Sequence, residues 1–204
     1  MNKLNKIESM ALFMRRKILD ISFQSSHAAH LGGGLSMVEI MATLYSQILN
    51  FDKDNPRWIN RDRFILSKGH GVLGLFSALL AVGLISEKKY ATYLTNESDL
   101  IAHPIMNLDL GIESSNGSLG QGLAMGIGIA CAAKKNNDLD YKAYVLMGDG
   151  ECNEGSVWEA VMLAPQLKLD NLIAIVDYNK LQSDMTPSSE IINFGNLALK
   201  FKNF

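Results

Sequence analysis

The sequence has few of the residues that would tie a protein to a disulfide framework, a zinc site or a nucleic acid. It holds only 2 cysteines and 4 prolines among 204 residues. The cysteines, Cys131 and Cys152, lack the paired spacing of disulfide or zinc frameworks. The formal net charge is -2, and the longest lysine and arginine run is "RRK" at 15–17. A basic surface for binding nucleic acid is therefore not expected.

Long hydrophobic runs are also missing. The apolar stretches carry glycines or charges and stop short of the roughly 20 residues that a membrane span needs. The N-terminal stretch "MNKLNKIESM" is polar, unlike a signal peptide. Hydrophobic residues make up 48% of the chain, which suffices for a sizeable core. These features predict a soluble protein of the reducing cytoplasm, with one or at most two domains.

Helical spacing of apolar residues recurs along the chain. Residues 4–23 place apolar side chains on one helical face. After the glycine cluster "HLGGGLS", which we interpret as a loop, Ser36 and Glu39 form a capping box that would open the next helix. Further elements are expected as a short strand at 62–67 and as helices at 36–49, 69–83, 86–94, 120–135 and 196–204.

Two apolar runs in the second half, "KAYVLM" and "NLIAIVD", do not alternate with polar residues. Such runs are typical of strands that are buried on both faces. The residues between them, 156–169, have the helical period and a length that suits a crossover. The pattern predicts a right-handed βαβ unit with parallel strands, and so an α/β fold class.

Polar side chains follow both runs where the strands would end. Asp149 comes just after "YVLM", and Asn179 follows "NLIAIV" about 30 residues later, the length of one βαβ unit. Parallel strands carry ligand sites at their carboxyl ends, and neighbouring strands lie about 4.8 Å apart. The aspartate carboxylate and the asparagine amide oxygen are therefore expected close together.

One carboxylate and one neutral oxygen suit Mg²⁺, which keeps few protein ligands and completes its shell with phosphate oxygens and water. Gly150 permits close approach of an anion, and a helix that begins near Ser156 offers free N–H groups. The loop therefore predicts a magnesium diphosphate site, with a solvated acid in a polar turn as the alternative. An EF-hand would need glycine at Glu154 and glutamate at Ala160, and the chain has no Gly-Lys-Ser/Thr of a P-loop.

Four motifs, taken together, resemble one enzyme family. "GDG" at 148–150, followed by "YN" at 178–179, resembles the thiamine-diphosphate binding motif. The other motifs are similar to those of transketolases: "AHLGGGLS" (29–36), "DRFILSKGHG" (62–71) and "IESSNGSLGQGLAMGIGIA" (112–130). They stand in family order over roughly residues 10–204. The resemblance implies the thiamine-diphosphate-binding fold, an α/β architecture with a mainly parallel sheet flanked by helices.

The resemblance also implies site residues. It implies metal ligands at Asp149, Asn179 and the backbone carbonyl of Leu181, with Mg²⁺ or, in its place, Ca²⁺ or Mn²⁺. It implies that thiamine diphosphate is bound by His70, Gly117, Leu119, Asp149, Gly150, Glu154 and Asn179. His30, His103 and Glu154 take catalytic roles: the histidines bind sugar hydroxyls and move protons, and Glu154 crosses the dimer interface.

Each of these residues has a plainer interpretation. His70 alone would be a loop or core histidine, and His103 precedes a proline, which favours an extended loop. Glu154 could serve only as an acid at a helix N-terminus, where the dipole favours negative charge. Two departures also stand out: Leu31 and Ser118 replace family prolines, and the first bears on which sugar is accepted. His27 has no counterpart in the family.

In transketolases the glutamate that activates the cofactor lies on a separate pyrimidine-binding domain, and nothing in residues 1–204 matches that domain. The chain is therefore expected to be a single diphosphate-binding domain, incomplete at its C-terminus. We interpret it as the N-terminal subunit of a split transketolase, which pairs with a C-terminal subunit in an α2β2 heterotetramer. That assembly would transfer a two-carbon ketol unit from a phosphorylated ketose to an aldose.

Two alternatives remain open at this point. Half of a related enzyme, similar to 1-deoxy-xylulose-phosphate synthase or a 2-oxoacid dehydrogenase, would share the diphosphate loop. A non-catalytic half could instead bind and regulate a partner. The histidines at 30, 70 and 103 favour the transketolase form over its enzyme rivals.

Overall fold

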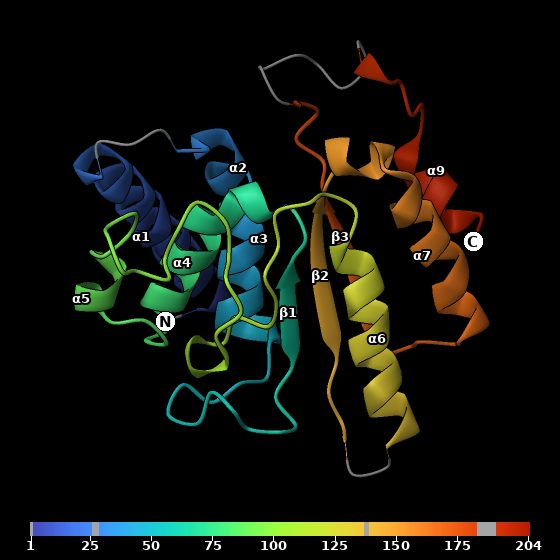
Figure 1. The fold of residues 1–204 in the computed structure, drawn as a ribbon, viewed down its shortest axis with the longest axis horizontal. Coiled ribbons are helices and arrows are strands. Elements are labelled where there is room, and N and C mark those ends of the chain that lie inside the picture. The colour runs from blue at the N-terminus through green and yellow to red at the C-terminus, as the bar shows by residue number, and fades with distance from the viewer. Residues whose placement is uncertain (1, 26–28, 137–138, 183–190) are drawn as a thin grey trace. The chain divides into compact units, whose positions relative to one another are not determined.

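The computed structural model describes all residues except 1, 26–28, 137–138 and 183–190 (Figure 1). The chain divides into two compact units. Unit 1 comprises Met1–Asp62 and Gly69–Gly117, and unit 2 comprises Arg63–Lys68 and Ser118–Phe204. Within the described ranges, no helix is long and apolar enough to cross a membrane. The interpretation of 1–204 as a single, incomplete domain stays a prediction.

Unit 1 is helical. Its helices are α1 (Lys3–Gln24), α2 (Leu31–Leu35), α3 (Val38–Thr43), α4 (Val72–Ala81) and α5 (Glu87–Tyr90), with a π turn at Leu44–Ile48 and 3₁₀ turns at Gly69–Gly71 and Leu108–Leu110. The apolar face predicted for α1 is confirmed, because Ala11, Met14, Ile18 and Ile21 are buried. Helix α4 is buried along nearly its whole length, so it forms the centre of this unit.

The glycine cluster is helical, contrary to the expected loop. It forms α2, in which Gly34 packs against Gly74 of α4. A Cβ on Gly34 would lie 3.2 Å from the Gly74 nitrogen, and a Cβ on Gly74 would lie 2.9 Å from the Gly34 oxygen. The glycines therefore serve the close approach of two helices, which local sequence does not reveal.

The predicted capping box is also wrong. Ser36 is the C-terminal cap of α2, and its hydroxyl donates to the Gly33 carbonyl at 3.4 Å. Glu39 lies in the first turn of α3 but forms an ion pair with Arg15 of α1. The hydroxyl of Ser36 bonds within α2, and the carboxylate of Glu39 bonds to a different helix, so neither side chain caps α3.

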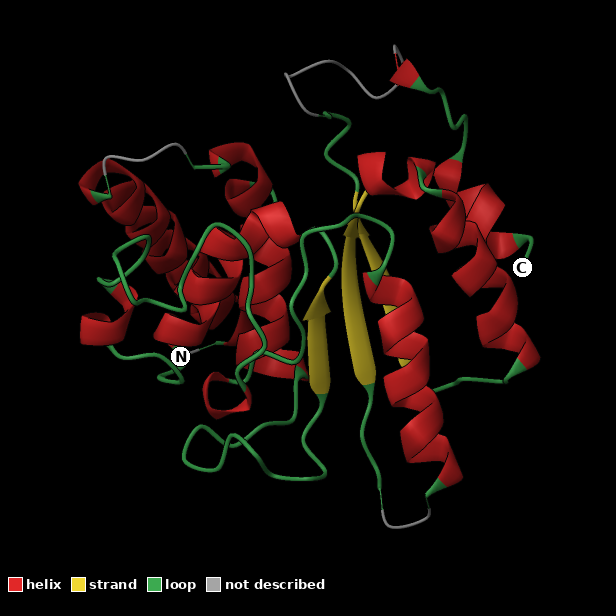
Figure 2. Cartoon of the chain, viewed as in Figure 1, coloured by secondary structure: helices red, strands yellow, loops and turns green. Residues whose placement is uncertain are grey.

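Unit 2 contains the predicted βαβ arrangement. Its parallel strands are β1 (Arg63–Leu66), β2 (Ala143–Gly148) and β3 (Leu172–Asp177), in the order β1-β2-β3, and its helices are α6 (Gly122–Lys135), α7 (Gly155–Gln166) and α9 (Leu197–Lys202). Figure 2 shows α6 and α7 beside the yellow strands, with α7 crossing over from β2 to β3. The α/β class and the parallel register are confirmed.

The core of unit 2 lies between the sheet and its helices. Ile65, Val145 and Met147 pack with Leu123 of α6 and Val157 of α7, all nearly inaccessible to solvent. Strand β2 is buried as predicted, whereas β3 is only half-buried. Strand β3 lies at one edge of the described sheet. The prediction of burial on both faces therefore holds for β2 alone.

Candidate cofactor-binding site

The loops after β2 and β3 meet in unit 2, as the sequence predicts. Gly148, the last residue of β2, pairs with Asp177, the last residue of β3. The next residue, Asp149, donates its backbone N–H to the Asp177 carbonyl at 3.2 Å. Its carboxylate accepts the N–H of Gly150 at 2.9 Å and that of Lys180 at 3.0 Å. Asp149 is only 2% exposed, so it ties the two loops together at the carboxyl end of the sheet.

The loop after β3 presents the other two predicted metal ligands in a tight turn. Asn179 accepts the N–H of Leu181 through its side-chain oxygen at 2.9 Å. Between them, Lys180 has a φ of 63°, a left-handed conformation that costs a non-glycine residue about 1 kcal/mol or more. The bond from Lys180 to the Asp149 carboxylate holds this turn. Asn179 and Leu181 are exposed.

These residues fit a magnesium diphosphate group. The donors are a carboxylate, an amide and a backbone carbonyl, which are hard oxygen ligands of the kind Mg²⁺ takes. No cluster of three or more His, Cys, Asp or Glu side chains suited to a metal occurs in the part of the chain that the structure describes. The site therefore suits an ion that receives further oxygens from a bound diphosphate.

Two amide side chains beside the loop each have one buried atom without a hydrogen bond. The side chains of Asn153 and Gln182 face each other at 3.4 Å, yet Asn153 Oδ1 and Gln182 Nε2 are buried without a hydrogen bond. Gly150 lies against the same glutamine, because a Cβ there would stand 2.8 Å from Gln182 Cγ. Orphaned polar atoms are costly when buried, so their presence here is consistent with a site completed by a polar ligand.

Three predicted histidines gather in unit 1. The ring of His30 lies 5.8 Å from that of His70 and 6.1 Å from that of His103, centroid to centroid. His30 is exposed and precedes α2. A Cβ on Gly33 would lie 2.5 Å from His70 Cδ2, so the absence of a side chain at Gly33 leaves space for the His70 ring. His27 lies outside the described residues. The structure thus brings together all three histidines that the resemblance singles out.

The remaining predicted residues occupy loops and caps. Gly117 lies beside His103 in unit 1, where a Cβ would stand 3.6 Å from His103 Cδ2. Leu119 is half-buried in the loop before α6. Glu154 is the exposed N-cap residue of α7 and makes no capping bond with its side chain. Their assigned roles stay predictions.

Sequence reasoning missed the buried charges below the loops of unit 2. Glu151, 2% exposed, accepts hydrogen bonds from the Ser67 hydroxyl and from the N–H groups of Gly120 and Gly148. Lys68 forms an ion pair with Asp177 at 2.6 Å, with only 2% and 6% of their side chains exposed. The available signal was position: all three charged residues lie at the end of an apolar strand or within three residues of it.

We assign Cys152 no nucleophilic role. Burial, and secondarily the carboxylates of Glu151 and Asp149, raise the pKa of its thiol to about 12. We expect iodoacetamide at pH 8 to leave Cys152 of the folded chain unmodified while it alkylates the half-buried Cys131, as measured by peptide mass spectrometry. In urea both should react. Equal rates in the folded chain would contradict this assignment.

The same pKa shift makes stability depend on pH. Folding favours the neutral Cys152 thiol. The contribution of this thiol to the free energy of unfolding is therefore fully present below the unfolded thiol pKa of about 8.5, and it is lost as the pH rises towards 12.

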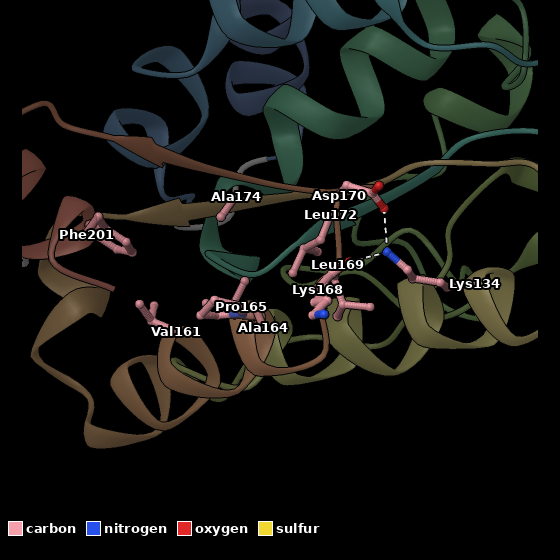
Figure 3. Close-up of a pocket in the computed structure, with 11 residues that line it drawn as sticks. Lys134, Val161, Ala164, Pro165, Lys168, Leu169, Asp170, Leu172, Ala174 and Phe201 are labelled. Carbon is pink, nitrogen blue, oxygen red and sulfur yellow. Dashed lines mark hydrogen bonds and ion pairs between the residues drawn. The ribbon is translucent and has the colours of Figure 1, made fainter.

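A separate hollow of unit 2 does not involve the predicted site. It is a cavity of about 610 Å³ beside β3, lined mainly by apolar side chains, including Leu123, Val161, Pro165, Leu169, Leu172 and Phe201. Figure 3 shows these side chains, and the ion pair of Lys134 with Asp170 at the rim. None of its lining residues is a predicted cofactor ligand.

Comparison with known proteins identifies the family of the chain. Residues 8–203 match the family model described as "Transketolase, thiamine diphosphate binding domain". An apulose-4-phosphate transketolase subunit of Phocaeicola vulgatus is 42% identical over 190 residues, covering 93% of this chain and 66% of that protein. The 6-deoxy-6-sulfo-D-fructose transketolase subunit SqwG of a Clostridium species is 42% identical over 155 residues, covering 76% of this chain and 56% of its own length.

Comparison with solved structures leads to the same family. Transketolase from Campylobacter jejuni superposes with a TM-score of 0.88 at 32% identity, covering all of this chain and 32% of that one. The fold and loops are those of a thiamine diphosphate binding domain. The chain belongs to the transketolase family. It spans just under two thirds of the length of the first two curated relatives, 66% and 64%.

Proposed function

We propose that this chain, together with a partner subunit, transfers a two-carbon ketol unit from a phosphorylated ketose to an aldose. The observation that carries the proposal is the contact between the Asp149 carboxylate and the N–H of Lys180, which joins the two predicted metal-binding loops. This contact, within a domain of the transketolase family, supports a role as the diphosphate-binding half of the enzyme.

The metal ligands in this proposal are Asp149, Asn179 and the Leu181 carbonyl, holding Mg²⁺, with Ca²⁺ or Mn²⁺ as substitutes. Gly150 contacts the diphosphate, because the absence of a side chain lets an anion approach the backbone closely. Bound thiamine diphosphate supplies the electron sink of the reaction, and the protein supplies geometry and protons. The hydrogen bonds within unit 2 support the ligand assignment, because each side-chain oxygen is already oriented by a backbone N–H.

The histidines contact the reactants. His30 and His103 bind sugar hydroxyls and move protons, and His70 stands beside the diphosphate. Gly117 and Leu119 contact the cofactor, and Glu154 acts across a subunit interface. The ring contacts of His30 with His70 and His103 support a shared task for these side chains. The exposed position of Glu154 leaves it available to another polypeptide.

The partner in this proposal is a C-terminal subunit that carries the pyrimidine-binding domain and the activating glutamate, in an α2β2 heterotetramer. The relatives from Phocaeicola and Clostridium are both named as transketolase subunits. Those names also point to substrates with a terminal phosphate or sulfonate, which supports a phosphorylated ketose here. We place the assembly in the cytoplasm, in line with two free cysteines.

The test begins with a pull-down of the chain from its native extract and identification of a stoichiometric partner by mass spectrometry. The purified complex is then titrated with thiamine diphosphate by calorimetry and assayed for ketol transfer. We expect cofactor binding that requires Mg²⁺ and disappears with EDTA, together with transfer from a ketose phosphate. A complex that binds no thiamine diphosphate, or binds it without transferring ketol units, would refute the proposal.

A further inference from the structure

Glu151 connects three segments of unit 2 that are far apart in the sequence. Its Oε1 accepts the hydroxyl of Ser67, at the end of β1, and the N–H of Gly120, before α6, at 2.8 Å. Its Oε2 accepts the N–H of Gly148, at the end of β2, at 3.0 Å. One carboxylate thus bonds to the ends of β1 and β2 and to the loop before α6.

A second layer of contacts fixes the same segments. The Ser67 hydroxyl oxygen accepts the N–H of Gly122 at 3.1 Å, so the first turn of α6 is tied to β1 as well. Gly120 has a φ of 80°, and a Cβ there would stand 2.5 Å from Ser156 Oγ, which itself donates to the Gly120 carbonyl at 3.0 Å. The loop before α6 therefore has one backbone conformation, set by polar contacts.

Two of the three segments that Glu151 joins carry proposed cofactor contacts. Gly148 immediately precedes Asp149, the proposed metal ligand, and Gly120 immediately follows Leu119, the proposed cofactor contact. Glu151 itself is 2% exposed, and we assign it no direct contact with metal or cofactor. It would affect cofactor binding by fixing the positions of Gly148 and Gly120.

We propose that Glu151 is a positioning residue of the cofactor site, because its carboxylate sets the loop of Leu119 at a fixed distance from the loop of Asp149. This inference rests on the proposed function and extends it to a residue that touches no ligand. Charged acceptors form stronger hydrogen bonds than neutral ones, and this one serves three donors. Groups that orient metal ligands typically contribute 10–100-fold to affinity.

The informative substitution is Glu151→Gln. Glutamine keeps the size, but its amide oxygen replaces only one carboxylate oxygen, and its NH₂ group would face an N–H or O–H donor. We expect the Kd for thiamine diphosphate, measured by calorimetry on the purified complex in excess Mg²⁺, to rise at least about tenfold. The measurement is made well below the unfolding midpoint, where the variant is fully folded.

A matched control separates positioning from general stability. Val161→Ala removes buried methyl groups from α7 of the same unit and touches none of the bonds of Glu151. If the variant is folded, lower stability alone does not change its Kd. A tenfold weaker Kd for Glu151→Gln, with Val161→Ala unchanged, supports the inference. Equal Kd values for all three proteins, or equal weakening of both variants, would overturn it.

If Glu151→Gln does not fold, Ser67→Ala tests the inference in its place. It removes the hydroxyl donor to Glu151 and the acceptor for Gly122, so a loss of affinity in the same direction, smaller than that of Glu151→Gln, is expected. An unchanged Kd in that variant would count against the inference. If the wild-type complex itself binds no thiamine diphosphate, the proposed function fails, and this inference falls with it.

Discussion

Replacing Asp149 by asparagine is expected to abolish useful affinity for thiamine diphosphate, with a Kd at least about 100-fold higher. The substitution keeps the size of the side chain and removes the single negative charge among the proposed metal ligands. Removing a group that only orients a ligand typically costs 10–100-fold, so removing the charge of a ligand should cost no less. Calorimetry on the complex with its partner, in excess Mg²⁺, measures the change.

The structure gives a second reason for this large effect. The Asp149 carboxylate accepts two backbone N–H groups, from Gly150 and Lys180. An asparagine can accept only through its one oxygen, and its NH₂ group would oppose the other N–H. Because Lys180 has a left-handed conformation, losing its bond would also release the turn that carries Asn179 and Leu181.

The control for this experiment is Glu159→Gln. Glu159 is exposed on α7 of the same unit, and its substitution removes the same charge at a position outside the loops. Its Kd should stay close to that of the wild type. An Asp149→Asn variant that binds within about threefold of wild type, in the same Mg²⁺, would exclude Asp149 as a metal ligand, because loss of even an orienting group costs more.

Much of unit 2 could be predicted because its signals are local. The apolar runs before Asp149 and Asn179 identify β2 and β3, and the helical period between them requires parallel strands. Parallel strands end at the same edge of the sheet, so the meeting of these two loops followed from topology alone. The helical glycine cluster at α2 could not be predicted in this way. Its cause is the contact of Gly34 with Gly74, forty residues away.

The buried charges escaped prediction for a related reason. Acids and lysines in polar loops are almost always solvated, so sequence alone assigns Glu151 and Lys68 to the surface. Their burial depends on partners that arrive from distant segments: Ser67 and Gly120 for Glu151, and Asp177 for Lys68. The grouping of the three histidines was likewise implied only by the family resemblance, since each lies on a different segment of unit 1.

The buried pair of Lys68 and Asp177 leads to the largest expected effect on stability. We expect Lys68→Met to lower the free energy of unfolding by about 3–5 kcal/mol, because removing one partner leaves the charge of the other in a region that solvent does not reach. Domains of this kind are stable by only about 5–15 kcal/mol, so the variant would lose a large share of its stability. Urea unfolding followed by circular dichroism measures the change.

Two further variants test the cause of that loss of stability. Lys134→Met is the same substitution in the same unit, but it breaks an ion pair with Asp170 that is open to solvent, so a much smaller loss is expected. Lys68→Met combined with Asp177→Asn removes both charges and should recover part of the stability. If Lys68→Met cost no more than Lys134→Met, the pair would contribute nothing beyond a surface contact. The Asp177 carbonyl also accepts the N–H of Asp149, so the buried pair lies directly beside the loop that holds the proposed metal.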